Sequence, residues 1–348
     1  MQNSGNQSKT TFLTFIKIMK TPKKFLMVAS AAILAGAVSC NKTDSPAQTE
    51  GTPAELTLNI SNGAFTKAAI NEENENKVNN VQIFVFRKDG ELDAYATSTQ
   101  KNDIKISCTT GPKDVYALVN APDGSKISKK SELEATTSKL SDNSLTNFVM
   151  IGSKAVEMTP AVNETIEVSR IAARLTVSKI TAAFTSQAYK QMEFKVNKIY
   201  LVNAAGDVNY NLEKKAPATW FNKMAYTTSD VDELLYANAS DTKITEETPY
   251  DTPASFYTYP NSTQTDSQTE VFSARFTRVV VETTLGGKTY YYPVSIENIE
   301  SNKYYNIKNL TITRPGSLSP DTPVSSLECT VNIEVKEWGQ GMEKDFTI

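Results

Sequence analysis

Two adjacent glycines, Gly286 and Gly287, give the strongest local constraint on the fold of this chain. They lie between two segments rich in β-branched and aromatic residues, 275–284 and 289–296. A glycine turn between two such segments is typical of a β-hairpin, because glycine reaches the positive φ angles that tight hairpin turns need. The sequence therefore predicts a pair of antiparallel strands in this region.

Short β-type segments recur along most of the chain. Each is bounded by turn-forming residues, and they lie at 56–60, 78–86, 92–95, 104–108, 115–119, 148–151, 165–168, 175–177, 194–202, 256–261, 304–312 and 331–335. Helical patterns are rare, and we expect one short helix capped by Ser131 and another at 230–236. Many short strands and few helices predict an all-β protein made of β-sandwiches.

The length of the chain predicts about two domains, since it has 348 residues. In the segment 169–174 two arginines flank a small apolar patch, and comparable lengths of chain lie on either side. We place the boundary here, which gives an N-terminal β-sandwich at 54–168 and a C-terminal β-sandwich at 169–348. The alternative is that these arginines protect the edge of a strand.

Composition excludes several classes of function. The net charge of -3 supplies no basic field for nucleic acid, so we expect no nucleic-acid partner. Histidine is absent, which removes the commonest general base and metal ligand, and we expect no enzyme, cofactor or metal site. Paired carboxylates are the remaining route to catalysis, although 39 acidic residues supply such pairs by chance. Cys108 and Cys329 fall in different predicted domains, and we expect two buried thiols without a bridge.

The N-terminus has the pattern of an export signal. Lysines at 17, 20, 23 and 24 precede an apolar run at 25–38, so residues 1–39 are predicted to be a signal peptide, with a cleaner start at Met19. The run ends in small residues before Cys40, which resembles the bacterial lipobox in which the cysteine is lipidated. The alternative is ordinary cleavage near Ala37, with Cys40 a free thiol. Residues 40–53 hold no core formers and predict a flexible tether.

A strand predicted directly after this tether has an unusual continuation. Leu56, Leu58 and Ile60 alternate with polar residues, and a turn-prone segment then leads to Lys67 and Ala68. The acidic, polar residues 71–77 are expected to be loose, and such loops are preferred sites of proteolysis. We therefore hypothesise that a trypsin-like protease cuts between Lys67 and Ala68 and releases 54–67. The alternative is a permanent first strand followed by an ordinary surface lysine.

The C-terminus alternates in the same way. Apolar residues alternate with polar ones before two glycines and resume after them, and they are Val331, Ile333, Val335, Met342, Phe346 and Ile348. A chain that ends on an apolar face must bury that face against something. We hypothesise that 331–348 is a donor strand that adds to the sheet of a neighbouring molecule. The alternative is a last strand that stays in its own domain.

The order and spacing of several segments resemble the FimA/Mfa-type fimbrillins of Bacteroidales, which build the type V pilus. The segments that carry the resemblance are 37–40, 114–122, 148–152, 170–174, 256–261, 290–294, 302–305 and 312–317. The resemblance covers nearly all of the chain after residue 19. It implies two tandem transthyretin-like domains, export as an outer-membrane lipoprotein, cleavage after a basic residue by a surface protease, and polymerisation with other fimbrial subunits by donor-strand exchange. Lys67 matches the cleavage position, where arginine is usual, so the protease stays unidentified.

The function implied by this resemblance is that of a structural subunit of an extracellular fimbrium that supports adhesion. The alternative is a fimbrial tip adhesin or a surface glycan-binding lipoprotein. Such a protein needs an exposed aromatic platform, for which 220–221 and 290–292 are candidates. The other interpretation of those aromatic residues is packing within the core and across strands.

Overall fold

The chain folds almost entirely into β-strands, and the predicted all-β class is confirmed. This computed structural model describes residues 51–62, 72–325, 328–338 and 344–347. The predicted signal peptide at 1–39, Cys40 and most of the tether at 40–53 lie outside the described residues. So do Lys67, Ala68, Met342 and Ile348.

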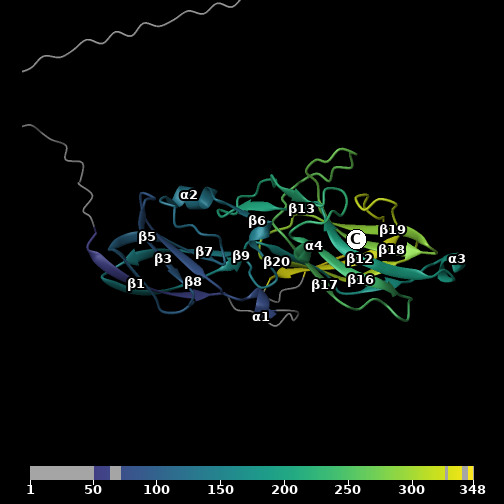
Figure 1. Cartoon of the computed structure of the whole chain (residues 1–348), viewed down its shortest axis with the longest axis horizontal. Coiled ribbons are helices and arrows are strands. Elements are labelled where there is room, and N and C mark those ends of the chain that lie inside the picture. The colour runs from purple at the N-terminus through teal and green to yellow at the C-terminus, as the bar shows by residue number, and fades with distance from the viewer. Residues whose placement is uncertain (1–50, 63–71, 326–327, 339–343, 348) are drawn as a thin grey trace, which may run out of the picture. The chain divides into compact units, whose positions relative to one another are not determined.

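Two sheets are built from the first half of the described chain (Figure 1). The smaller sheet has the strand order β4-β1-β8, with β1 at Pro53–Ser61, β4 at Ile104–Thr109 and β8 at Ala161–Glu167. The larger sheet has the order β3-β2-β5-β7-β9, with β2 at Val81–Arg87, β3 at Leu92–Ser98, β5 at Gly111–Val119, β7 at Met150–Met158 and β9 at Ser169–Arg170. Side chains from both sheets meet in one apolar core.

Two further sheets are built from the second half. The first has the order β17-β10-β20-β21-β22, with β11 also paired to β20; its strands are β10 Ala173–Val177, β11 Ile180–Ala182, β17 Ala254–Thr258, β20 Lys303–Ile312, β21 Cys329–Glu337 and β22 Lys344–Thr347. The second has the order β16-β12-β18-β19, with β12 at Phe194–Val202, β16 at Tyr236–Lys243, β18 at Thr277–Leu285 and β19 at Lys288–Ile296.

The hairpin predicted at the two glycines is confirmed. β18 and β19 pair antiparallel from Thr277 with Ile296 to Leu285 with Lys288. Gly286 and Gly287 form the turn with φ angles of 56° and 82°. Two successive positive φ angles match the twist of a two-residue hairpin, and a side chain at either position would be strained.

The remaining elements are short. They are the two-stranded pairs β13 Ala204–Ala205 with β15 Trp220–Phe221 and β6 Thr137–Lys139 with β14 Asp207–Asn209, the helices α1 Glu72–Glu75, α2 Lys130–Ala135, α3 Gln187–Lys190 and α4 Asp232–Leu235, and the 3-10 turn η1 Leu140–Asp142. The cap predicted at Ser131 is wrong, because Lys129 is the residue before the first turn of α2. Glu132 accepts the backbone N–H of Lys129 and so takes over part of the capping.

The boundary predicted at residue 169 remains a prediction. Among the described strands, those before and after residue 171 share a sheet only where β6 pairs with β14. One apolar core nevertheless includes side chains from both halves: the ring of Phe148 lies 4.7 Å from that of Tyr257 and 5.4 Å from that of Trp338, between centroids. The two sets of strands are thus joined by a packed, dry contact.

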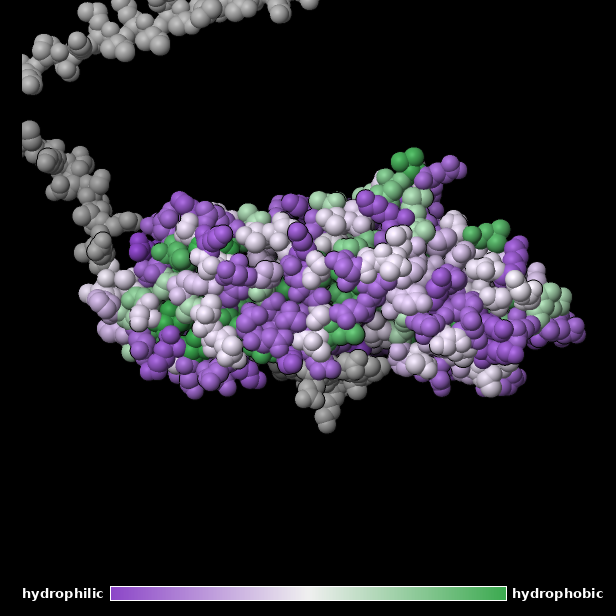
Figure 2. Space-filling model, viewed as in Figure 1, coloured by the Kyte–Doolittle hydropathy of each residue, from purple (hydrophilic) through white to green (hydrophobic). Residues whose placement is uncertain are grey.

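The exposed surface is mostly polar. On the face in Figure 2, apolar residues form separate spots among hydrophilic ones. Large apolar side chains that are strongly exposed include Val271 at 79% and Leu318 at 67%. Within the described ranges, no helix is both long and apolar enough to span a membrane.

Candidate functional site: the first strand and its seat

Strand β1 is the central strand of its sheet. It pairs antiparallel with β4, where Leu56 lies opposite Ile106, and parallel with β8, where Leu56 lies opposite Val162. Figure 1 shows β1 beside β8. Both backbone edges of β1 are therefore used, and β4 and β8 lie on opposite sides of it.

The apolar side chains of β1 point into the core. Leu56 and Leu58 are fully buried and Ile60 is 4% exposed, and all three belong to the core between the two N-terminal sheets. Burying each such side chain contributes about 1.5–3 kcal/mol, so the three together contribute about 4.5–9 kcal/mol. This amount is comparable with the whole stability of a typical domain. If β1 left and no other strand replaced it, the domain would lose much of its stability.

The other face of β1 carries polar contacts to both neighbouring strands. Glu55 accepts from Lys105 Nζ of β4 at 3.1 Å, and Asn59 Nδ2 donates to Asn163 Oδ1 of β8 at 3.1 Å. These exposed contacts contribute little to stability. They do fix which residue faces which, and a one-residue slip would turn Leu58 out of the core.

Removal of β1 would open a defined seat. The backbone edges of Ile104–Thr109 and Ala161–Glu167 would face each other across an empty strand position, above an apolar groove. Unpaired edges of this kind are templates for another strand. We use "seat" below for these two strands and the core face between them.

The loop predicted to be loose at 71–77 is ordered over its described part, so that expectation is wrong. Residues 72–75 form α1, and the side chain of Glu75 is 1% exposed. Its carboxylate accepts from Arg174 Nη1 at 3.2 Å, Trp338 Nε1 at 3.1 Å and Tyr257 Oη at 2.5 Å. The sequence around Glu75 is typical of an exposed loop. Glu75 is nevertheless buried, because the Arg174 guanidinium and the donors of Trp338 and Tyr257 bind its carboxylate.

Arg170 binds the same segment. Its Nε donates to the backbone carbonyl of Glu75 at 3.1 Å, and its guanidinium lies 4.4 Å from the ring centroid of Trp338. Arg170 and Arg174 are both 3% exposed. The two buried arginines therefore bind the chain segment that follows β1, and they do not shield an exposed strand edge.

Asn120 holds the far end of this segment. Its side chain accepts from the N–H of Asn79 at 2.8 Å, and donates to the carbonyls of Lys77 at 2.7 Å and Phe148 at 3.0 Å. Asn120 has a φ of 58°, which asparagine tolerates better than most residues. The chain from 72 to 80 is thus fixed to the body at two points.

The C-terminal strand lies inside its sheet. β21 pairs with β20 on one side and with β22 on the other, and Val331 and Ile333 are buried while Val335 is partly buried. β22 is an edge strand, and its residue Phe346 pairs with Ile333 through the backbone. Among the described strands, β22 therefore needs to break only one ladder to leave.

Comparisons with known proteins bear on this arrangement. Residues 54–166, which begin at β1 and end in β8, match the family model described as the major fimbrial subunit protein FimA. The major fimbrium subunit FimC of Porphyromonas gingivalis is 26% identical over 316 residues, covering 82% of this chain and 64% of the relative. The resemblance to the FimA-type fimbrillins is confirmed.

Solved structures share the fold of this fimbrillin-like chain. A cell adhesion protein, called putative, from Bacteroides eggerthii has a TM-score of 0.66 at 20% identity, covering 83% of this chain and 97% of that one. A fimbrilin (FimA) from Porphyromonas gingivalis W83 has a TM-score of 0.58 at 17% identity, covering 82% of this chain and 98% of that one. The chain spans 64% of the length of the curated relatives it matches, which is less than two thirds.

The aromatic candidates for a glycan platform are packed against protein. Trp220 donates its indole N–H to the carbonyl of Pro217 at 3.0 Å, and its ring contacts Phe272 edge to face at 5.6 Å. Tyr292 is fully buried. Tyr290 and Tyr291 are partly buried at positions that pair with β18. These contacts favour the packing interpretation.

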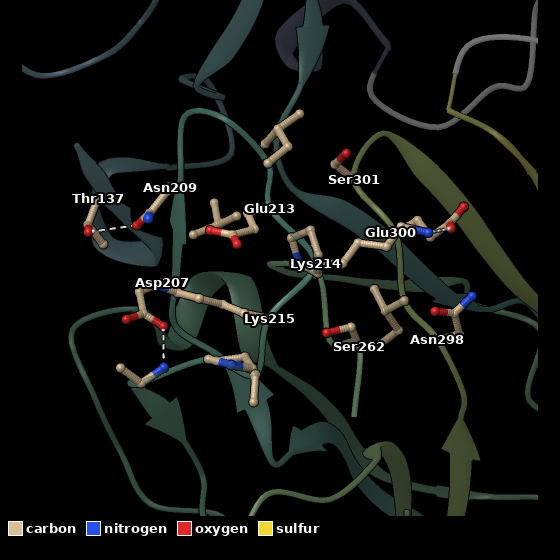
Figure 3. A pocket seen from close by; sticks show the side chains of 17 residues that line it. Thr137, Asp207, Asn209, Glu213, Lys214, Lys215, Ser262, Asn298, Glu300 and Ser301 are labelled. Carbon is tan, nitrogen blue, oxygen red and sulfur yellow. Dashed lines mark hydrogen bonds and ion pairs between the residues drawn. The ribbon is translucent and has the colours of Figure 1, made fainter. Parts of the chain in front are cut away.

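A hollow of about 360 Å³ lies beside β14 (Figure 3). Several of its polar groups are already paired: Lys214 with Glu300 at 2.8 Å, and Asp207 with the N–H groups of Ala218 and Thr219. Among the described residues that line it there is no aromatic ring on which a sugar could stack. The hollow does not contact β1 or its seat.

The two described cysteines are both buried and unbridged, as predicted. Burial raises the pKa of the Cys329 thiol to about 12, and burial, followed by the nearby charge of Asp93, raises the pKa of the Cys108 thiol. Both are therefore inert packing residues at neutral pH. Within the described ranges, no group of three His, Cys, Asp or Glu residues is placed to hold a metal ion.

Proposed function

We propose that this chain is a structural subunit of a cell-surface fimbrium that polymerises by donor-strand exchange and supports adhesion. The observation that carries the proposal is the position of β1. It is a strand near the start of the folded part, central in its sheet and fully buried on one face, and the chain runs directly from it towards Lys67. The trypsin-sensitive link that the sequence predicts after this strand supports its release.

The proposed path begins with export and lipidation at Cys40, which holds the subunit at the outer membrane. A trypsin-like surface protease then cuts between Lys67 and Ala68. The cut severs β1 from the body but breaks none of its contacts, so β1 stays in the seat until another strand displaces it. Other fimbrial subunits are the proposed source of that strand, and the contact is head-to-tail, so it extends into a filament.

The structure bears on which part of 331–348 is the better donor. β21 would have to break ladders on both sides and withdraw Val331 and Ile333 from the core. β22 would break one ladder. We therefore propose that the donor is the segment beyond Trp338, which includes Met342, Phe346 and Ile348, while β21 stays as its base.

The proposal is tested by limited proteolysis and electron microscopy. The Cys40→Ser chain, which lacks the lipid acceptor, is treated with a limiting amount of trypsin. We expect the first cut after Lys67, followed by filaments. A variant that lacks residues 339–348 but keeps β21 and Trp338 is the matched control, and we expect it to be cut identically and to form none.

Two results would reject the proposal. One is a preferred first cut elsewhere, with Lys67 left intact in the filaments. The other is filament formation by the variant without residues 339–348, because that variant has no donor segment.

A further inference from the structure

The chain segment that follows β1 and the residue at the base of the C-terminal segment meet at one buried carboxylate, that of Glu75. We propose that Glu75, with Arg170, Arg174, Tyr257 and Trp338, forms a clasp that holds the base of the C-terminal segment in the unassembled subunit. This inference rests on the function proposed above, and it concerns the regulation of that assembly. The five residues are called the clasp below.

The clasp is dry. The exposed fractions of its five side chains are all at or below 6%, and Tyr257 and Trp338 stack with 5.6 Å between their ring centroids. A buried carboxylate that loses its partners leaves uncompensated charges behind, which is strongly destabilising. The contacts of Glu75 are therefore strong local constraints on the groups that make them.

The clasp joins four separate parts of the chain. Glu75 comes from α1, Arg170 and Arg174 from β9 and β10, Tyr257 from β17, and Trp338 from the position directly after β21. Arg170 Nη1 also donates to the carbonyl of Trp338 at 3.4 Å. Trp338 is thus hydrogen-bonded through both its indole N–H and its backbone carbonyl, at the point where the chain continues toward β22.

The clasp is linked to the residue after β1 through Asn76. Asn62 Nδ2, one residue after β1, donates to the backbone carbonyl of Asn76 at 2.9 Å, and the side chain of Asn76 accepts from Arg170. The departure of β1 therefore removes a contact from the residue next to Glu75. The same segment keeps its second attachment through Asn120, so it stays on the body after cleavage.

These contacts define a sequence of events. While β1 is in place, Glu75 is held and Trp338 is fixed, which keeps the C-terminal segment in its own sheet. When β1 leaves, the Glu75 segment loses the hydrogen bond from Asn62. This loss weakens the hold on Trp338, so the donor is released more readily in the same subunit whose seat has opened. A subunit with its own first strand still in place would then present no donor.

The test uses hydrogen exchange of the uncleaved chain, read by mass spectrometry. Glu75→Gln removes the negative charge that Arg174 faces and keeps nearly the same side-chain shape. We expect peptides from Lys336 to the C-terminus to exchange at least about tenfold faster, while peptides of β18 and β19 are unchanged. Glu91→Gln is the control, because Glu91 forms an exposed pair with Lys129 at 2.7 Å.

A second variant covers the case in which Glu75→Gln does not fold. Trp338→Phe keeps an aromatic ring but loses the N–H that Glu75 accepts, and we expect the same faster exchange at the C-terminus. Unchanged C-terminal exchange in the folded variants would overturn the clasp. Equal acceleration in β18 and β19 would also overturn it, because it would indicate general destabilisation.

Filament formation separates this inference from the proposed function. Faster C-terminal exchange supports the clasp even if the cleaved wild-type chain never forms filaments, and in that case only the proposed function fails. Filaments from the wild-type chain together with unchanged exchange in the variants would support the proposed function and reject the clasp.

Discussion

At the scale of single residues, a close backbone approach explains the glycine at position 152. A Cβ atom on Gly152 would lie 2.1 Å from the carbonyl oxygen of Glu167, far inside van der Waals contact. Gly152 therefore lets β7 pass against the end of β8, which in turn flanks β1. The sequence marks this position as part of a family pattern, but the clash partner is distant in sequence and only the fold identifies it.

The substitution Gly152→Ala should destabilise the protein by about 1–3 kcal/mol, as overpacking does, because β7 or β8 must move to admit the methyl group. Urea unfolding measures this change. Ser153→Ala is the matched control, since Ser153 is exposed on the same strand, and it should change the free energy of unfolding by less than about 0.5 kcal/mol. Equal effects from both substitutions would contradict the close approach.

At the scale of elements, β1 behaves as the sequence predicts because its signal is local. Alternation of apolar and polar residues sets a period of two, and this period alone indicates which side chains are buried. The same holds for the β18–β19 hairpin, where two glycines define the turn. The local sequence does not predict that residues 72–75 are ordered, because the side-chain and backbone partners that hold Glu75 lie 95 or more residues away.

Truncation of a buried β1 side chain should weaken the seat strongly. Leu58→Ala should lower the free energy of unfolding by about 2–5 kcal/mol, because it removes a fully buried side chain from the core. Thr57→Ala, on the outer face of the same strand, should cost less than about 1 kcal/mol. Chemical denaturation of the two uncleaved variants measures the difference, and comparable losses would show that β1 is not anchored through its inner face.

At the scale of the whole molecule, the all-β class followed from composition and strand patterns, whereas the contact between the two sets of strands did not. That contact depends on rings such as Phe148, Tyr257 and Trp338, which come from separate parts of the sequence. Aromatic residues predict burial, but not which partner buries them. The clasp was likewise invisible in the sequence, because each of its members is ordinary in its local context.

Buried tyrosines give the molecule a predictable response to alkali. Burial raises the pKa of Tyr200, Tyr257 and Tyr259 well above the ordinary value of 10.0. A group whose pKa is higher in the folded state stabilises fully below its unfolded pKa and loses that contribution as the pH rises. Stability should therefore be level up to about pH 9 and fall above about pH 10. Melting temperatures across this range test it, and a constant melting temperature up to pH 11.5 would contradict the burial of these rings.

The central claim is that β1 occupies a seat that another molecule later fills. Hydrogen exchange of the seat strands, Ile104–Thr109 and Ala161–Glu167, measured in filaments grown from cleaved protein, tests it most directly. The account predicts that these amides are as protected as in the uncleaved chain, although peptides of Pro53–Ser61 are missing from the filaments. Filaments that retain one copy of Pro53–Ser61 per subunit, or whose seat strands exchange freely, would contradict it.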